Sequence, residues 1–291
     1  MVQPLKRPQT KPPSLAPLRP RSMLFTLFGD YVYPQRGDIW LGSLVIIGAA
    51  LGMSEVAVRS AVARLARERW IVARRSGQRS YYRLSPAGKA LIEEGTQRIY
   101  RADGRTWDGN WCLLTYSIPE SRRSLRDRMR KQLAWLGFGP LSSGTYVAPR
   151  DVSAQVRRLA ERLGADGFAK TFIARGAGAT SDRQIVTQSW DLSRIARAYD
   201  RFINLYGPLY ARDKKRKSRR SLDDRDAFIM RFVLTHDFRR FPFIDPDLPR
   251  ALLPKRWAGA RARSLFETYH AMLTDGAMRF FEAVSATSTS G

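Results

Sequence analysis

The stretch AALGMSEVAVRSAVARLARERWIVARRSGQRSYY, from Ala49 to Tyr82, has the pattern of a helix, a tight turn, a second helix and a two-stranded hairpin. Gly52 and Met53 supply the turn, and Ser54 is a good N-cap for the second helix. Apolar residues recur along that helix at helical spacing, namely Val58, Ala61, Val62 and Leu65. This order of elements is typical of a winged helix-turn-helix.

The opposite face of the second helix is basic. It carries Arg59, Ser60, Ala63, Arg64 and Arg67. A helix whose free face offers guanidinium groups and small side chains can lie in the major groove of DNA. We expect Arg59 and Arg64 to read base edges. Phosphate contacts are expected from Ser54, Ser60 and Arg67.

A basic hairpin is predicted after Trp70, where IVARRSGQRSYYRL alternates apolar and basic residues around a tip at residues 76–78. We expect Arg75 and Arg79 to hold this hairpin against the DNA backbone or the minor groove. Taken alone, the preceding helix could equally be an ordinary amphipathic helix with a solvated charged face. The hairpin at this distance favours DNA binding.

The overall charge supports a polyanionic partner. The chain has 51 Lys and Arg residues against 26 Asp and Glu residues, which gives a formal net charge of +25 and a pI near 11.1. Each phosphate that such a protein neutralises releases condensed counterions and strengthens association at low salt. The charge does not distinguish DNA from RNA or from an anionic membrane.

Length and composition predict two or three domains, because 291 residues at 44% hydrophobic content can bury a sizeable core. The single cysteine, Cys112, excludes an internal disulfide framework and a zinc ribbon, and its apolar surroundings predict a buried strand residue. The longest apolar run, Trp40 to Met53, is too short to span a bilayer, and we expect it to form the first helix of the helix-turn-helix.

Residues 1–22 carry five basic residues, six prolines and no acidic residue, without an apolar stretch long enough for a signal peptide. We therefore expect residues 1–20 to form a disordered basic tail that touches the DNA backbone. The protein is expected to be soluble and cytoplasmic.

The chain as a whole is predicted to be an α+β multidomain protein. A winged helix-turn-helix domain is expected over 21–104, opening with a helix at Met23–Phe28 and closing with a helix from Pro86 towards Tyr100. Asp, Gly and Asn cluster at 102–109, which indicates a domain boundary.

A strand, helix, strand, helix, strand order predicts a ferredoxin-like α+β domain over 105–178. Its first strand is expected at 110–119, and the segment 176–182 is expected to be a linker. The remainder, 179–291, is expected to be a mainly helical C-terminal domain that holds the effector and dimer surfaces. Within it, the run RDKKRKSRR from Arg212 to Arg220 is expected to be a flexible surface loop in preference to a second phosphate contact.

Several strings together resemble the PaaX family of transcriptional repressors, which control bacterial phenylacetic acid catabolism. They are GMSEVAVRSAVARLAR in the helix-turn-helix, the hairpin strand Arg79 to Leu84, QRIY ending at Tyr100, HDFRRFPFIDPDLP from His236, and LLPKRWAG ending at Gly259. The resemblance covers nearly the whole chain after residue 21. It implies a homodimeric repressor with an N-terminal winged domain, a central domain similar to the ferredoxin-like CRISPR adaptation nuclease, and a helical C-terminal domain.

The resemblance also implies release from double-stranded operator DNA by an aryl-acyl-CoA, typically phenylacetyl-CoA. Such a ligand needs aromatic walls and cationic ends in its pocket. The candidate effector residues are Phe238, Arg239, Arg240, Phe241, Phe243 and Trp257. The alternative is that the aromatic side chains are core and that the arginines make interdomain or dimer contacts.

The sequence admits two alternative functions. A metal-dependent nuclease would need a carboxylate at the end of the first strand of the central domain, but no carboxylate occurs there until Glu120. Phosphate-cradling, dinucleotide and serine-elbow motifs are also absent from the sequence, and a structural role is expected for His236. We therefore expect no enzyme, no metal and no resident cofactor. A regulator or activator that answers to a different acyl-CoA stays open.

Overall fold

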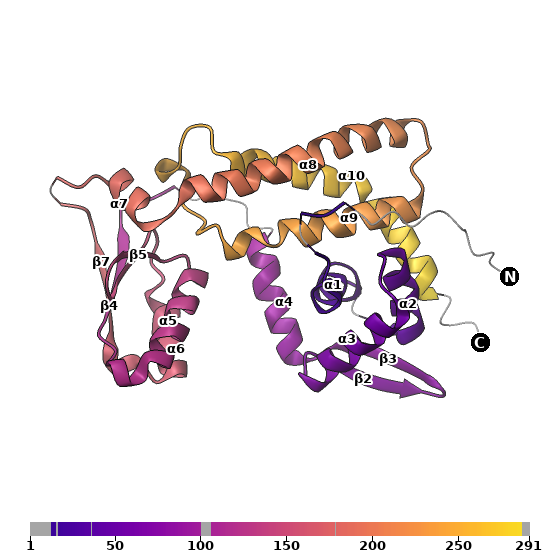
Figure 1. The fold of residues 1–291 in the computed structure, drawn as a ribbon, viewed down its shortest axis with the longest axis horizontal. Coiled ribbons are helices and arrows are strands. Elements are labelled where there is room, and N and C mark those ends of the chain that lie inside the picture. The colour runs from indigo at the N-terminus through magenta and orange to yellow at the C-terminus, as the bar shows by residue number, and fades with distance from the viewer. Residues whose placement is uncertain (1–12, 16, 36, 100–105, 178, 287–291) are drawn as a thin grey trace. The chain divides into compact units, whose positions relative to one another are not determined.

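The computed structural model describes residues 13–15, 17–35, 37–99, 106–177 and 179–286. These residues form two compact units (Figure 1). Unit 1 takes its described residues from 1–100, 201–239 and 261–291, and unit 2 takes its own from 101–200 and 240–260. The fold is mixed α+β, with many helices and two small sheets in the described parts of the chain. The expected α+β multidomain class is confirmed at this level.

Unit 1 begins with α1 (Pro20–Leu27), which continues into a π-helical turn at Phe28–Val32. Pro20 suits the first turn of a helix because that turn does not use its N–H. The helices α2 (Leu41–Ala50) and α3 (Glu55–Arg67) follow, with Gly52 between them at φ +80°. These three helices match the expected order, and α1 contacts both α3 and the later helix α9 (Figure 1).

A three-stranded antiparallel sheet follows α3 in unit 1. The hairpin strands β2 (Ile71–Ser76) and β3 (Arg79–Leu84) are joined at Gly77, whose φ of +57° suits the tight turn. The short strand β1 (Ile39–Trp40), which the sequence pattern did not predict, pairs with β3. Helix α4 (Pro86–Ile99) comes after the hairpin, as expected.

The core of unit 1 joins its N-terminal helices to α9 (Asp224–Phe238) and α10 (Ala258–Ala286). The fully buried ring of Tyr31 lies 4.9 Å from the ring of Phe228 in α9 and 5.4 Å from that of Phe281 in α10. The Ser43 hydroxyl of α2 donates to the Val284 carbonyl of α10 at 3.0 Å. Unit 1 therefore depends on contacts between residues more than two hundred positions apart.

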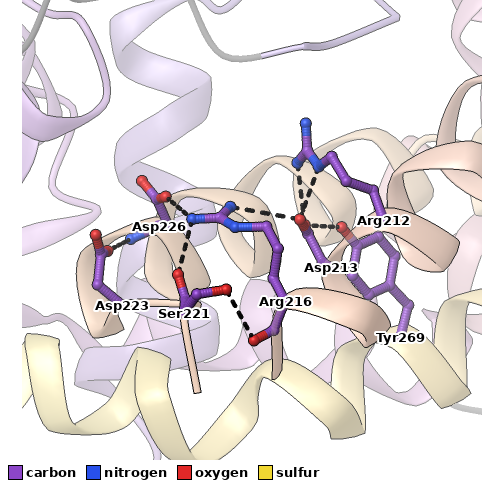
Figure 2. Close-up of polar contacts among 7 residues, drawn as sticks. All are labelled: Arg212, Asp213, Arg216, Ser221, Asp223, Asp226 and Tyr269. Atoms are coloured by element: carbon purple, nitrogen blue, oxygen red, sulfur yellow. Dashed lines mark hydrogen bonds and ion pairs between the residues drawn. The ribbon is translucent and has the colours of Figure 1, made fainter. Parts of the chain in front are cut away.

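The basic run at residues 212–220 is not a loop, so that expectation was wrong. Residues up to Ser218 belong to α8 (Leu192–Ser218). The run holds the buried carboxylate of Asp213, which accepts from Arg212 Nε at 2.8 Å and from the hydroxyl of Tyr269 on α10 at 2.6 Å (Figure 2). Because this contact lies within the core, the helix is anchored there and continues through the charged residues.

Unit 2 contains a four-stranded antiparallel sheet in the order β5-β6-β4-β7. The strand β4 (Trp111–Tyr116) lies within the predicted range 110–119, and β6 (Thr145–Ala148) and β7 (Ala169–Ala174) are the second and third strands of the predicted order. The edge strand β5 (Gly139–Ser142) was not predicted. It is short and contains a proline, which is tolerated at a sheet edge.

Helices α5 (Arg123–Trp135) and α6 (Ser153–Leu163) pack on one face of this sheet around Cys112 and Leu114. Cys112 is fully buried, as expected, and burial raises the pKa of its thiol. The other face carries Trp111 and Val147, which pack against α7 (Asp182–Ser189) and Leu248. Single 3₁₀ turns lie at Glu120–Arg122, Asp166–Phe168, Phe241–Phe243 and Arg250–Leu252.

Two expectations fall largely outside the described residues. Of the predicted tail over 1–20, only 13–15 and 17–20 are described, and Ser14 and Leu15 donate to the buried carboxylate of Asp237 on α9. Of the predicted boundary over 102–109, the description begins at residue 106.

Candidate nucleic-acid interface

The helix α3 is built as the sequence indicates. The Ser54 hydroxyl caps it by accepting from the Ala57 N–H at 3.2 Å, and Met53 N donates to the Gly48 carbonyl at 2.8 Å across the turn. Its buried side chains are Val58, Ala61, Val62 and Leu65. This packing fixes the rotation of the helix and decides which side chains remain in solvent.

The exposed face of α3 consists of Glu55, Val56, Arg59, Ser60, Ala63, Arg64, Arg67 and Glu68. At about 100° per residue, Val56, Ser60, Ala63 and Arg67 lie directly opposite the buried side chains and form the midline of this face. Arg59 lies on one flank of the midline and Arg64 on the other. The four sequence-predicted residues of the helix therefore share one accessible surface.

Both flanking arginines are paired with carboxylates of their own helix. Arg59 Nε donates to Glu55 at 2.7 Å, and Arg64 Nε donates to Glu68 at 2.8 Å. These pairs are exposed, so they contribute little stability and can exchange for other anions. The hydrogen bond from Arg64, with a second from Arg21 of α1, lowers the pKa of Glu68 to about 2.

The hairpin extends the basic surface within unit 1. Arg75 lies on β2 opposite Ser80, and its side chain is exposed. Arg79 begins β3, with its guanidinium 5.0 Å above the ring of Trp40. That stacking holds the arginine beside the hairpin tip, where a phosphate could reach it.

Sequence reasoning missed three residues of this surface. Arg74 on β2 donates to Asp38 at 2.7 Å and lies over the Tyr81 ring, so its direction is fixed. Arg21 reaches Glu68 from α1, a contact between distant residues that no local pattern marks. Val56, by contrast, was detectable, because its spacing from the buried residues places it on the midline.

Two of the candidate effector residues lie in unit 1. The ring of Phe238 is buried and stacks on Phe266 at 4.0 Å. The Arg239 guanidinium donates to the Ser22 hydroxyl of α1 at 2.6 Å, its one hydrogen-bond partner among the described residues. Burial lowers the pKa of Arg239 to about 10, so the guanidinium stays charged at neutral pH.

The other four candidate effector residues lie in unit 2. Phe241 and Trp257 are buried against Tyr199, at 4.0 and 6.0 Å between ring centroids. Arg240 is exposed. Phe243 is 70% exposed and lies against the ring of Trp135 at 4.9 Å. Among the six, Arg240 and Phe243 are therefore exposed, Arg239 is partly buried, and the other three are buried.

His236 is buried in the last turn of α9, where its Nδ1 lies 2.8 Å from the Thr26 hydroxyl of α1. The neighbouring Asp237 accepts from the Tyr206 hydroxyl at 2.7 Å. Within the described ranges no group of three or more His, Cys, Asp or Glu side chains is arranged to hold a metal ion. No described helix is long and apolar enough to cross a membrane.

Comparison with known proteins places the whole chain among related sequences. Family models match three successive segments: "PaaX-like protein" over 19–88, "PaaX protein central Cas2-like domain" over 104–186, and "PaaX-like protein C-terminal domain" over 190–283. The transcriptional repressor PaaX of Escherichia coli (strain K12) is 34% identical over 275 residues, which are 94% of this chain and 86% of the relative. The match to a transcriptional repressor agrees with the expected role as a regulator.

A solved structure has a similar fold. The uncharacterized protein Rv0674 from Mycobacterium tuberculosis has a TM-score of 0.62 to this chain at 21% sequence identity. The match covers 92% of this chain and 99% of that chain. At this identity the likeness concerns the fold alone.

Proposed function

The chain belongs to the PaaX family, and from this premise we propose that it is a transcriptional repressor that binds double-stranded operator DNA and is released by an acyl-CoA. The observation that carries the proposal is the exposed basic face of α3 beside the basic hairpin, within the segment that the first family model matches. The curated relative is a transcriptional repressor, which supports the same role here.

We assign the α1 to α4 region to a winged helix-turn-helix with α3 as the recognition helix. Arg59 and Arg64 read base edges, and exchange of their carboxylate partners for DNA groups costs little because both pairs are exposed. Ser60 and Arg67 contact phosphate. Ser54 can do so as well, because its hydroxyl accepts from Ala57 and retains its proton for donation. Arg75 and Arg79 hold the hairpin against the backbone.

The proposed organisation keeps three functional segments. Residues 21–104 read DNA, residues 105–178 form a ferredoxin-like domain, and residues 179–291 carry the effector and dimer surfaces. The antiparallel sheet with α5 and α6 on one face supports the second assignment. A homodimer would place two copies of α3 in successive major grooves, about 34 Å apart, on a palindrome-like operator.

The proposed effector is an aryl-acyl-CoA such as phenylacetyl-CoA, and the regulated genes are those of phenylacetate degradation. Arg239 supports an anionic ligand, because its charged guanidinium is partly buried and its one hydrogen-bond partner among the described residues is a neutral hydroxyl. A phosphate group is a stronger acceptor for guanidinium than a hydroxyl. Arg240 and the exposed Phe243 have the chemistry for further contacts to such a ligand.

Helix α1 offers a physical link between effector and DNA. Ser22 of α1 is held by Arg239, which follows the last residue of α9, and the adjacent Arg21 holds Glu68 at the end of α3. A ligand that draws Arg239 away from Ser22 would loosen α1 and, with it, the support of the recognition helix. By linkage, the ligand must bind the DNA-bound protein more weakly by the same factor.

The DNA-binding half is tested by recovering bound duplexes from a genomic fragment pool and measuring affinity against salt. Arg59→Ala should reduce discrimination between the recovered duplex and random DNA. Arg79→Ala should weaken binding to both equally and reduce the salt slope by about 1. Arg128→Ala, on the exposed surface of α5, is the matched control. Unchanged operator affinity in both hairpin and helix variants would reject the winged helix-turn-helix assignment.

The effector half is tested by titrating the protein–DNA complex with a panel of acyl-CoA thioesters. Release by aryl thioesters alone is expected, whereas indifference to every thioester would remove the regulatory half. Release by another class of thioester would reassign the ligand. Arg240→Ala should weaken the response and leave operator affinity unchanged, whereas Arg239→Ala, which also removes the contact to Ser22, should weaken both. Arg128→Ala is again the control.

A further inference from the structure

Val56 is an apolar side chain held in solvent at the first turn of α3. It is 78% exposed, the highest value among the exposed large apolar side chains of the described residues, whereas Ile46, the next in unit 1, is 45% exposed. Single apolar side chains on a surface are common and need no explanation by themselves. The position of this one on the exposed face of α3 distinguishes it.

Val56 lies on the midline of that face, between the two flanking arginines. The side chains that share the midline next to it, Ser60 and Ala63, are short, so the helix axis can approach a groove floor closely. The arginines on the flanks are long enough to reach base edges on either side of the helix. Val56 is therefore the side chain that reaches the groove floor first, because it is a branched aliphatic residue in the turn nearest the base edges.

In the major groove, the apolar group that a base offers is the C5 methyl of thymine. We propose that Val56 contacts one thymine methyl in each operator half-site and thereby specifies an A·T pair at that position. This inference rests on the proposed DNA-binding function and assigns a base to one side chain. The contact removes two apolar surfaces from water, which Ser, Thr or an arginine at this position would not do as completely.

The test uses the highest-affinity duplex that the full-length protein recovers from a randomised pool. Each thymine is replaced in turn by uracil, which removes the C5 methyl and leaves the hydrogen-bonding groups unchanged. We expect one thymine per half-site at which uracil weakens binding about fourfold, the effect of one methyl group of apolar burial. The Val56→Ala substitution should weaken binding to the thymine duplex by a similar factor. The variant should then bind the thymine and uracil duplexes with the same affinity.

Val72→Ala is the matched control, because Val72 is an exposed valine of the same unit that lies on β2. It should keep the full difference between thymine and uracil. A wild-type protein that is indifferent to uracil at every position overturns the inference, as does a Val56→Ala protein that is as sensitive as the wild type. Either result leaves the proposed function intact, whereas failure to enrich any duplex would reject both.

Discussion

At the scale of single residues, Asp213 shows how a charged sequence can enter a core. Its carboxylate is 1% exposed and accepts from the Tyr269 hydroxyl at 2.6 Å and from Arg212 at 2.8 Å (Figure 2). Arg216 lies between this carboxylate, at 3.5 Å, and that of Asp226, at 2.7 Å. Burial raises the pKa of Tyr269, which therefore stays a hydrogen-bond donor at any physiological pH.

Replacing Asp213 by alanine should lower the free energy of unfolding by about 1–3 kcal/mol, because the buried Tyr269 hydroxyl loses its acceptor. Tyr269→Phe should cost less, about 1 kcal/mol, because it removes the donor and leaves the carboxylate with its two arginines. Urea denaturation of the two variants measures both values. Equal and negligible losses would show that the carboxylate is not part of the core in solution.

The sequence could not reveal this contact. Runs of charge are usually solvated, and Asp213 lies within a run of basic residues. The local sequence therefore does not indicate that its carboxylate is buried. Its decisive partner, Tyr269, is 56 positions away. The cap of α3 was predictable at the same scale, because Ser54 and Ala57, whose N–H donates to the Ser54 hydroxyl, lie three positions apart.

At the scale of elements, the crossing of α2 and α3 depends on a residue without a side chain. A Cβ at Gly48 would overlap the Cγ2 atom of Val58, which is a buried residue of α3. Glycine therefore lets the two helices approach more closely than any other residue would. This approach sets the position of the exposed face of α3.

Gly48→Ala should destabilise unit 1 by about 1–3 kcal/mol through overpacking. Gly95→Ala in α4 is the control, because nothing lies within 4 Å of its added Cβ, and it should stabilise the helix by about 0.5–1 kcal/mol. Thermal unfolding followed by circular dichroism compares the two. A neutral Gly48→Ala would contradict the close crossing.

Elements with a strong local pattern were predictable, and elements defined by partners were not. The periodicity around Val58 and the alternation around Gly77 gave α3 and the hairpin within a residue or two. The strands β1 and β5 escaped prediction because two to four residues carry no period, and only their pairing with β3 and β6 makes them strands. The candidate effector residues of the C-terminal string were proposed with the help of the family resemblance, since composition alone does not separate core from pocket.

At the scale of the whole molecule, unit 1 is discontinuous in sequence. Asp30, within the π-helical turn, accepts a hydrogen bond from Arg231 of α9 at 2.9 Å, and Tyr31 packs on rings from α9 and α10. Local patterns predict a continuous N-terminal domain, and they contain no information about these distant partners. The family-model matches and the compact units therefore divide the chain differently.

A fragment of residues 13–99 should not fold as a stable domain. It would expose the ring of Tyr31, because its partners Phe228 and Phe281 would be missing, at a cost of about 1.5–3 kcal/mol, and it would leave Asp30 without Arg231. We expect no cooperative thermal transition in the fragment by circular dichroism, in contrast to the full chain. A sharp transition at the temperature of the full chain would contradict this view of unit 1.

The docking of Val284 onto Ser43 also has a consequence for the order of synthesis. A nascent chain emerges from the ribosome with α2 and α3 long before α10 exists, so α2 lacks its contact with α10 until nearly all of the protein has been made. An interrupted translation product would thus carry every basic residue of α3 and the hairpin but would lack α10, which packs against α2. Premature termination is then expected to yield an inactive regulator and not a constitutive one.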